Sequence, residues 1–276
     1  MLHIRDEFSE LKKVVVCYGD QVPLAEEYQA DDPEQKKWGW QSWDKSLLLE
    51  QQSYFFDRLR AYNVELILPE TQKGMDWQMY TRDTAFVVND TLYYADVRTL
   101  KARRGEIEKL KTALHSYDPP MVPINAKIEG GDVLNYEGGC FVGVSNRTSK
   151  EAVDELKNYC EVTSFFLGDD VMHLDTRLTL LPNRYALAHL EAFQPEDRTF
   201  LQEHFTVIPV TKAETDKLGT NVFIVNPETI FVEASQTRIQ DELATAGFTI
   251  EVVPYSEPIA LGGSFRCTTL PLERKG

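Results

Sequence analysis

Five polar residues recur at nearly equal spacing along this chain, each just before an apolar segment. They are Asp83, Asp132, Asp175, Asn221 and Cys267, which are separated by 49, 43, 46 and 46 residues. A repeat architecture brings the equivalent positions of its units together in space. We therefore expect carboxylates, one cysteine and the neighbouring His173 to converge on a common centre.

Cys267 and His173 form the pair with the most evident chemistry. A cysteine nucleophile reacts as its thiolate, and a histidine 94 residues upstream can assist it only if the fold brings the two together. Their shared position in the repeat favours a catalytic pair over two structural residues. Cys17, Cys140 and Cys160 lie in or beside apolar strand-like or helical segments, where small buried hydrophobic residues are expected.

The acidic residues predict what such a centre would bind. Glu129, Asp83 and Asp175 only accept hydrogen bonds when ionised, so a pocket that they line suits a planar cation rich in N–H donors, such as a guanidinium. Zinc is the alternative counter-charge, but its structural sites favour short local spacings, and these groups are spread along the chain. We therefore predict no metal. Asp132, which follows two glycines, is expected to fix a turn.

The segments between these residues predict a ββαβ unit that is repeated five times. The first four units are expected as strand, strand, helix and strand at 85–88, 91–94, 101–115 and 121–124; 133–136, 140–144, a helix from Thr148 and 162–167; 177–181, 185–190, a helix from Pro195 and 205–210; and 221–225, 229–232, a helix ending at Gly247 and 248–253. Thr148 and Glu151 fit a capping box at the start of the second helix.

The two ends of the chain are expected to share the fifth unit, with strands at 267–272, 12–17 and 64–68 and a helix at 44–62. Pairing of the terminal strands would close a ring and remove exposed sheet edges, so residues 1–276 are predicted to form one domain. The stretch from Asp20 to Ser42 lacks periodicity, which is typical either of a functional lid or of a surface loop packed by its own tryptophans.

Composition narrows the classes of partner. The 276 residues carry a formal net charge of -15, which disfavours nucleic acids and anionic membranes and suits a small cation, although many proteins are acidic for solubility alone. No secretory signal or CxxC spacing is present, so a cytoplasmic protein without a redox motif is expected.

Four motifs together resemble the guanidino-group modifying enzymes, a superfamily that includes arginine deiminases, amidinotransferases and dimethylarginine dimethylaminohydrolases. They are Tyr80-Thr81-Arg82-Asp83, Ile128-Glu129-Gly130-Gly131-Asp132, His173-Leu174-Asp175 and Gly262-Gly263-Ser264-Phe265-Arg266-Cys267. The resemblance covers nearly the whole chain in order. It implies the five-bladed α/β propeller, or pentein fold, and no cofactor.

The resemblance also implies roles for individual residues. Cys267 would attack the guanidinium carbon, and His173 would protonate the departing nitrogen and then activate water. Glu129, Asp83 and Asp175 would hold the guanidinium nitrogens. Arg147 and Arg103 resemble the arginines that grip a substrate carboxylate, with Arg104 as an alternative to Arg103; their other interpretations are an arginine near a helix N-terminus and a solvated basic surface.

Two departures bear on the substrate. Dimethylargininases usually lack the acid that Asp175 supplies, and Arg82 replaces the acid that they carry before the aspartate. Both favour an unmethylated or differently substituted guanidine. The expected activity is hydrolysis to a ureido product plus ammonia or an amine, with amidino transfer to an amine as the alternative. A non-catalytic pentein binding protein is the alternative from another class, and homo-oligomers are left open.

Overall fold

Five sheets of three strands each make up this computed structural model, which describes residues 2–28, 42–95, 103 and 105–275. In every sheet, two strands form an antiparallel pair, and a third runs parallel to the second. A helix makes the connection to that third strand, because a parallel neighbour requires a long crossover. The ββαβ order is therefore as predicted.

The elements follow the predicted order closely. The sheets and their crossover helices are β3 (Ala85–Val88), β4 (Thr91–Ala95), α3 (Glu106–Leu114) and β5 (Met121–Ile124); β6 (Val133–Tyr136), β7 (Gly139–Val144), α4 (Lys150–Leu156) and β8 (Val162–Phe166); β9 (Leu178–Leu180), β10 (Tyr185–Ala188), α5 (Pro195–His204) and β11 (Thr206–Pro209); β12 (Phe223–Asn226), β13 (Thr229–Glu233), α7 (Thr237–Thr245) and β14 (Thr249–Val253); and β15 (Thr269–Arg274), β1 (Leu11–Val16), α2 (Lys45–Ala61) and β2 (Glu65–Ile67).

Two predictions fall partly outside the described residues. The helix expected at 101–115 begins at Glu106, and residues 101, 102 and 104 are outside the described part, so Arg104 is not placed. Residues 29–41 of the predicted lid are outside it as well. The described part of that stretch, up to Tyr28, contains turns and no helix or strand.

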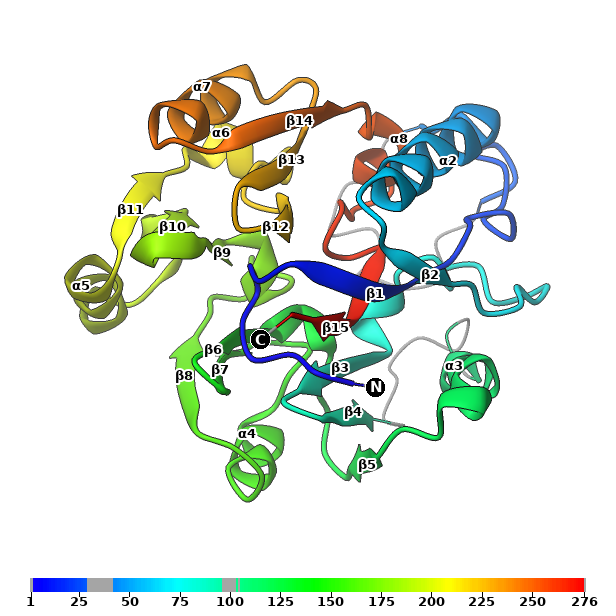
Figure 1. Ribbon diagram of the computed structural model, residues 1–276, viewed down its shortest axis with the longest axis horizontal. Helices are drawn as coiled ribbons and strands as arrows, with labels where there is room; N and C mark the ends of the chain where they lie inside the picture. Colours follow the sequence, from blue (N-terminus) through cyan, green and yellow to red (C-terminus); the bar gives the residue numbers. More distant parts are fainter. Residues whose placement is uncertain (1, 29–41, 96–102, 104, 276) are drawn as a thin grey trace.

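The terminal strands pair as predicted. β1 runs antiparallel to β15, with Val15 opposite Leu270, and the His3 amide donates to the carbonyl of Leu272 at 2.8 Å. Figure 1 shows the two strands side by side near the centre of the view, with both chain ends close to them. The sheet that contains the last strand is thus completed by the first residues of the chain.

Five buried apolar clusters hold the sheets together. Each cluster joins two neighbouring sheets, and following them from sheet to sheet leads through all five and back to the first. The crossover helices contribute to these clusters, with Phe55 and Phe56 of α2 as the largest such side chains. Figure 1 shows these helices at the periphery. Burial of the apolar faces is the main term that stabilises this arrangement.

Short 3-10 turns stand directly before three of the hairpins. They are η1 (Thr81–Asp83) before β3, η4 (Gly130–Asp132) before β6 and η5 (Leu174–Thr176) before β9. η4 packs against both η1 and η5. The first three phased residues of the sequence, Asp83, Asp132 and Asp175, therefore occupy equivalent turns that meet in space.

The predicted capping box at α4 is wrong by one residue. The N-cap is Ser149, whose hydroxyl accepts from the Ala152 amide at 3.3 Å. Thr148 is fully buried, and its hydroxyl instead accepts from the Glu129 amide at 3.2 Å. A buried polar group needs a partner, and the segment before η4 supplies one. Among the described residues, no helix is long and apolar enough to span a membrane.

Candidate active site

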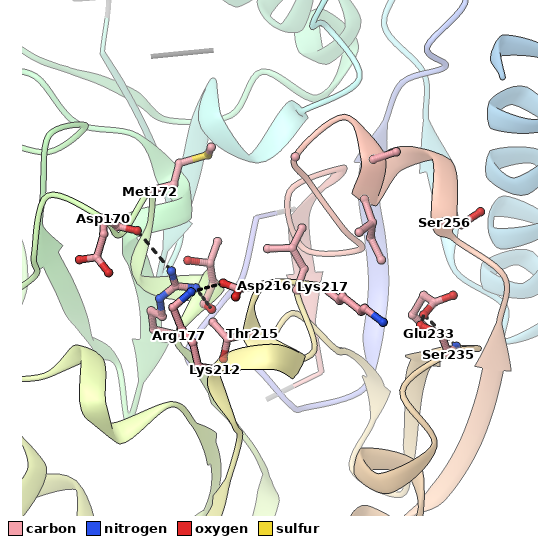
Figure 2. A pocket seen from close by; sticks show the side chains of 15 residues that line it. Asp170, Met172, Arg177, Lys212, Thr215, Asp216, Lys217, Glu233, Ser235 and Ser256 are labelled. Carbon is pink, nitrogen blue, oxygen red and sulfur yellow. Dashed lines mark hydrogen bonds and ion pairs between the residues drawn. The ribbon is translucent and has the colours of Figure 1, made fainter. Parts of the chain in front are cut away.

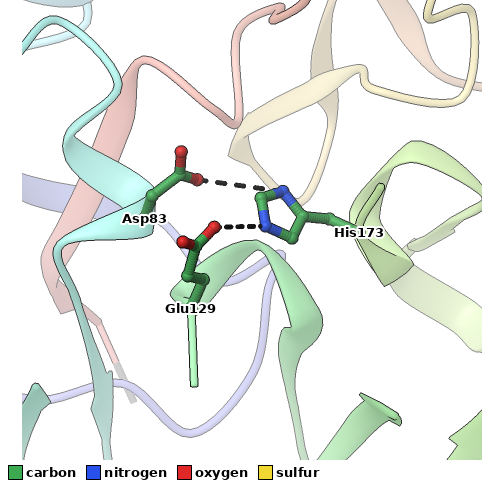
Figure 3. A group of neighbouring side chains, drawn as sticks. All are labelled: Asp83, Glu129 and His173. Atoms are coloured by element: carbon green, nitrogen blue, oxygen red, sulfur yellow. Dashed lines mark hydrogen bonds and ion pairs between the residues drawn. The ribbon is translucent and has the colours of Figure 1, made fainter. Parts of the chain in front are cut away.

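Asp83, Glu129 and His173 meet in a buried cluster, although they come from turns that precede three different sheets. The Glu129 Oε2 atom lies 2.8 Å from His173 Nε2, and Asp83 Oδ1 lies 3.8 Å from His173 Nδ1. Figure 3 shows both carboxylates directed towards the imidazole, each with a dashed line to one of its ring nitrogens. None of the three is more than 8% exposed. The sequence prediction that these residues converge is confirmed by this geometry.

The charge of His173 is set by its two acidic neighbours. Burial disfavours an imidazolium, but the charge of Asp83 and the hydrogen bond with Glu129 outweigh it and raise the pKa of His173 to about 9. The imidazole is therefore protonated near neutral pH. A buried, protonated histidine is a suitable general acid.

Glycine is required where the chain passes this histidine. A Cβ atom on Gly131 would lie 2.6 Å from His173 Nδ1, which is closer than any side chain allows. A Cβ atom on Gly263 would lie 2.3 Å from the Tyr80 ring and 3.0 Å from the Cys267 Cβ. These two positions let the backbone approach the site directly.

Cys267 is buried at the end of the turn that precedes β15. Its backbone is held from the first turn, because the Arg82 amide donates to the Cys267 carbonyl at 3.2 Å. Burial, together with the charges of Asp175 and Asp83, raises the pKa of the Cys267 thiol well above its usual range. Cys267 and His173 share no hydrogen bond in the described structure, but the charge of Asp83 acts on both.

Asp175 lies fully buried on another side of the centre. Its Oδ2 is 3.8 Å from Arg266 Nε, and neither carboxylate oxygen accepts a hydrogen bond from the protein. Burial raises the pKa of Asp175, while Arg266 and His173 oppose this effect. Asp83 Oδ1 also accepts no hydrogen bond. Three buried acceptor atoms of these two acids therefore lack a donor from the protein.

The two arginines predicted to bind a substrate carboxylate already contact carboxylates of the protein. Arg103 donates to Asp83 Oδ2 at 2.5 Å, to Glu106 at 2.9 to 3.1 Å and to the Tyr80 carbonyl at 2.9 Å. Arg147 Nη1 lies 3.4 Å from Glu129 Oε2. Both are buried. The structure thus brings both arginines next to the candidate site, where each pairs with one of its acids.

Asp132 fixes the turns, as the sequence predicted. It accepts from the Leu174 amide at 2.9 Å and from the Ser145 hydroxyl at 2.7 Å, so it ties η4 to η5. Burial raises its pKa to about 6, against the opposing influence of His173 and its hydrogen bonds. Its side chain therefore helps to position the segment that carries His173.

The same acids and histidine could in principle hold a metal ion. One ligand atom each from Asp83, Glu129 and His173 lies within 4.8 Å of the others, and neither Asp175 nor Cys267 belongs to that group. A metal ion at this position would need a neutral imidazole, so its binding would release the proton that His173 holds at neutral pH.

A cleft of about 610 Å³ opens beside the site. Its walls come from η5 and the residues on either side of it, from α6 (Lys212–Thr215) with the turn that follows, and from α8 (Ser256–Ala260) (Figure 2). Met172, Thr176 and Gly262 line it, each one residue along the chain from His173, Asp175 or Gly263. Ligand pockets of proteins have this size.

A comparison with models of protein families shows the family to which this chain belongs. The family model described as N,N dimethylarginine dimethylhydrolase, eukaryotic, matches residues 20–274. This chain belongs to that family. The resemblance read from the four motifs is thereby confirmed.

Two relatives illustrate the extent of the sequence similarity. The uncharacterized protein YkgA of Bacillus subtilis (strain 168) is 28% identical over 274 residues, which cover 98% of this chain and 94% of that protein. The arginine deiminase of Metamycoplasma arthritidis (strain 158L3-1) is 29% identical over 208 residues, or 58% of this chain and 50% of the relative.

Among solved structures, the product-bound N-terminal domain of ArgZ, an arginine dihydrolase from the ornithine-ammonia cycle in cyanobacteria, superposes with a TM-score of 0.84. It is 21% identical, and the match covers 96% of this chain and 98% of that domain. At this identity the likeness shows a shared mixed α/β fold of the pentein type.

Sequence reasoning missed a buried charge cluster beneath the site. Arg266 Nη2 donates to Glu7 Oε2 at 2.9 Å, and Glu7 Oε1 accepts from the Asn135 amide at 2.8 Å. Burial disfavours the Glu7 carboxylate, but Arg266, Arg82 and Arg274 lower its pKa to about 2. Glu7 lies in no motif, so no local signal could have found it.

Proposed function

We propose that this family member is a cysteine hydrolase of an arginine-type guanidine, and that its five sheets form a five-bladed α/β propeller acting as one catalytic domain. The observation that carries the proposal is the buried cluster of Asp83, Glu129 and His173 beside Cys267. Asp83 and Asp175 keep buried acceptor atoms without a donor from the protein, which is electrostatically costly, and a guanidinium substrate would relieve that cost.

The unpartnered acceptor atoms support a guanidinium in particular. Asp83 offers one buried oxygen and Asp175 two, all without a donor from the protein. A guanidinium carries N–H donors in one plane and matches carboxylates in pairs. Methyl groups on the nitrogens that face Asp175 would leave its oxygens unsatisfied. We therefore propose a substrate without methyl groups on that side.

The first step is attack by Cys267. The thiol of the resting protein holds its proton, because burial and two nearby carboxylates raise its pKa. The positive charge of a bound guanidinium opposes this effect, so that the thiol gives its proton to solvent water and becomes the thiolate. The sulfur then forms a bond to the guanidinium carbon, and the electron pair of one C=N bond moves to nitrogen.

The next steps use His173. At neutral pH its imidazolium donates a proton to one nitrogen as the bond between that nitrogen and the carbon breaks, and ammonia or an amine departs. An amidino group remains on Cys267. The neutral imidazole then takes a proton from water, whose oxygen bonds to the carbon. The carbon–sulfur bond breaks and releases a ureido product.

Arg103 and Arg147 remain proposed ligands for a substrate carboxylate. In the structure, each guanidinium contacts Asp83 or Glu129, so each also holds a substrate-binding acid in place. A substrate carboxylate would have to share or replace these contacts. Amidino transfer is the second outcome of the same intermediate, and some relatives, such as the glycine amidinotransferase of Danio rerio, bear that name.

The test is turnover of a guanidine panel, with ureido product and released ammonia or amine measured, together with intact-protein mass spectrometry for an amidino adduct. Cys267→Ala should reduce activity by at least about a thousandfold, whereas Cys17→Ala, which removes another buried cysteine, should not. Adding amine acceptors separates transfer from hydrolysis. Absence of both turnover and adduct would leave the non-catalytic interpretation.

A further inference from the structure

Arg177 is a nearly buried cation that lines the cleft without a carboxylate partner. Only 7% of it is exposed. Its Nη1 donates to the Thr176 carbonyl at 3.1 Å and its Nη2 to the Asp170 carbonyl at 3.3 Å. Within the described part of the chain, no carboxylate oxygen lies within 4.0 Å of it. Arg103, Arg147 and Arg266, by contrast, each pair with an acid.

The surroundings of Arg177 leave its charge incompletely balanced. Burial lowers the pKa of Arg177, and the charges of Asp170 and Asp216 oppose this effect only in part. Both aspartates are exposed to solvent, and Asp216 pairs with Lys212. A guanidinium presents a rigid fork of donors that a carboxylate matches bidentately. An anionic group in the cleft would complete this arrangement.

The position of the cleft connects Arg177 to the reaction. Figure 2 shows Arg177 on one wall with Asp170, Met172, Lys212 and Asp216 near it. Met172 and Thr176, on the same segment, flank the residues that would protonate and bind the guanidine. The volume of about 610 Å³ accommodates a ligand of amino-acid size.

We propose that this cleft binds the head group of an α-amino acid, with the carboxylate paired to Arg177 and the ammonium next to the exposed Asp170 and Asp216. The inference rests on the proposed function for its link to catalysis, because the amino acid would be the guanidine substrate or its ureido product. Arg177 is thus the alternative to Arg103 and Arg147 as the ligand of the substrate carboxylate, because the guanidinium groups of those two arginines already contact acids.

The binding test uses Cys267→Ser protein, in which turnover is blocked, and isothermal titration with arginine, citrulline and agmatine. Agmatine keeps the guanidine of arginine but lacks its carboxylate. Arginine should bind at least about tenfold more tightly than agmatine. Adding Arg177→Gln should abolish that difference, and Arg177→Lys, which keeps the charge but not the fork, should reduce it. Arg184→Gln, an exposed arginine of the same sheet, should leave it unchanged.

The outcomes separate this inference from the proposed function. If the wild-type protein turns over a guanidine but Arg177→Gln affects arginine and agmatine equally, the head-group site is wrong and the hydrolase proposal stands. If nothing is turned over but arginine or citrulline binding depends on Arg177, the site stands and the hydrolase proposal fails. An effect of Arg184→Gln as large as that of Arg177→Gln would overturn the site. Should Arg177→Gln fail to fold, Arg177→Lys decides alone, and an unchanged preference for arginine overturns the proposal.

Discussion

At the scale of single residues, His173 is a buried base kept charged by acids. Its pKa of about 9 lies above the usual 6.5, so its interactions stabilise the fold fully below pH 6.5, and this contribution is lost as pH rises through 9. Glu129→Gln keeps an acceptor but removes a negative charge. We expect the His173 transition, followed by NMR and assigned with a His173→Asn variant, to move to lower pH. An unmoved transition would contradict the assigned cause.

Asn221, the phased residue without an assigned chemical role, carries a second prediction. Its Oδ1 accepts from the Arg266 amide at 2.9 Å, and its Nδ2 donates to the Asp175 carbonyl at 3.1 Å, so it ties the cysteine segment to η5. Asn221→Ala leaves two buried backbone groups unpaired. The free energy of unfolding should fall by about 2 kcal/mol, and kcat by about tenfold because Cys267 loses its support.

A matched control is Asn226→Ala. Asn226 accepts from the Glu228 and Thr229 amides in the hairpin turn between β12 and β13. It makes the same number of hydrogen bonds away from the site, so its loss should lower stability without a specific effect on kcat. Equal effects of both variants on kcat would show that Asn221 does not position the nucleophile. Denaturant unfolding and steady-state kinetics measure both quantities.

Much of the site could be predicted at this scale, because repeat phase identifies equivalent positions without a structure. Asp83 and Glu129 were predicted to converge with His173, and they do. The pairing of Arg103 with Asp83 and Glu106 could not be predicted, because it depends on side-chain directions that spacing does not encode. The same holds for Arg177, which no motif singles out.

At the scale of elements, hydrophobic alternation and turn residues predicted the strand ends to within two residues, while the start of α4 was placed wrongly. Thr148 and Ser149 both suit an N-cap, and only tertiary context decides between them. Because Thr148 is buried, its hydroxyl accepts a hydrogen bond from the Glu129 amide. Ser149 therefore remains as the N-cap of α4. The two hydroxyls therefore have different functions, although they are adjacent.

This difference yields a paired prediction. Ser149→Ala removes the cap and should lower the free energy of unfolding by about 1 kcal/mol without changing kcat/KM. Thr148→Val keeps shape but removes the acceptor of the Glu129 amide, so kcat/KM should fall by about tenfold. Circular dichroism with urea and steady-state assays measure both. A larger loss of activity for Ser149→Ala than for Thr148→Val would contradict the role of Thr148 in holding Glu129.

At the scale of the whole molecule, the repeat predicted the pairing of the two terminal strands. It did not predict the buried ion pair between Glu7 and Arg266, which also joins the two ends of the chain. β1 and β15 pair as expected from the incomplete fifth unit. The charged groups beneath the site bring together segments with no sequence relation: Glu7 from the N-terminal segment, Asn135 from β6 and Arg266 from the cysteine turn. Such long-range polar contacts leave no periodic signal.

Glu7 therefore provides a test of how the ends are joined. Its pKa of about 2 lies below the usual 4.5, so its contribution to stability is present above pH 4.5 and is lost as pH falls towards 2.

Glu7→Gln leaves Arg266 without its buried partner and should lower the free energy of unfolding by about 3 kcal/mol at pH 7. In urea titrations, the gap between wild type and variant should be nearly complete at pH 4.5 and clearly smaller at pH 3. Glu10→Gln, which breaks a surface pair with Lys12, should cost much less. A gap that does not change with pH would show that the Glu7 charge does not secure the chain ends.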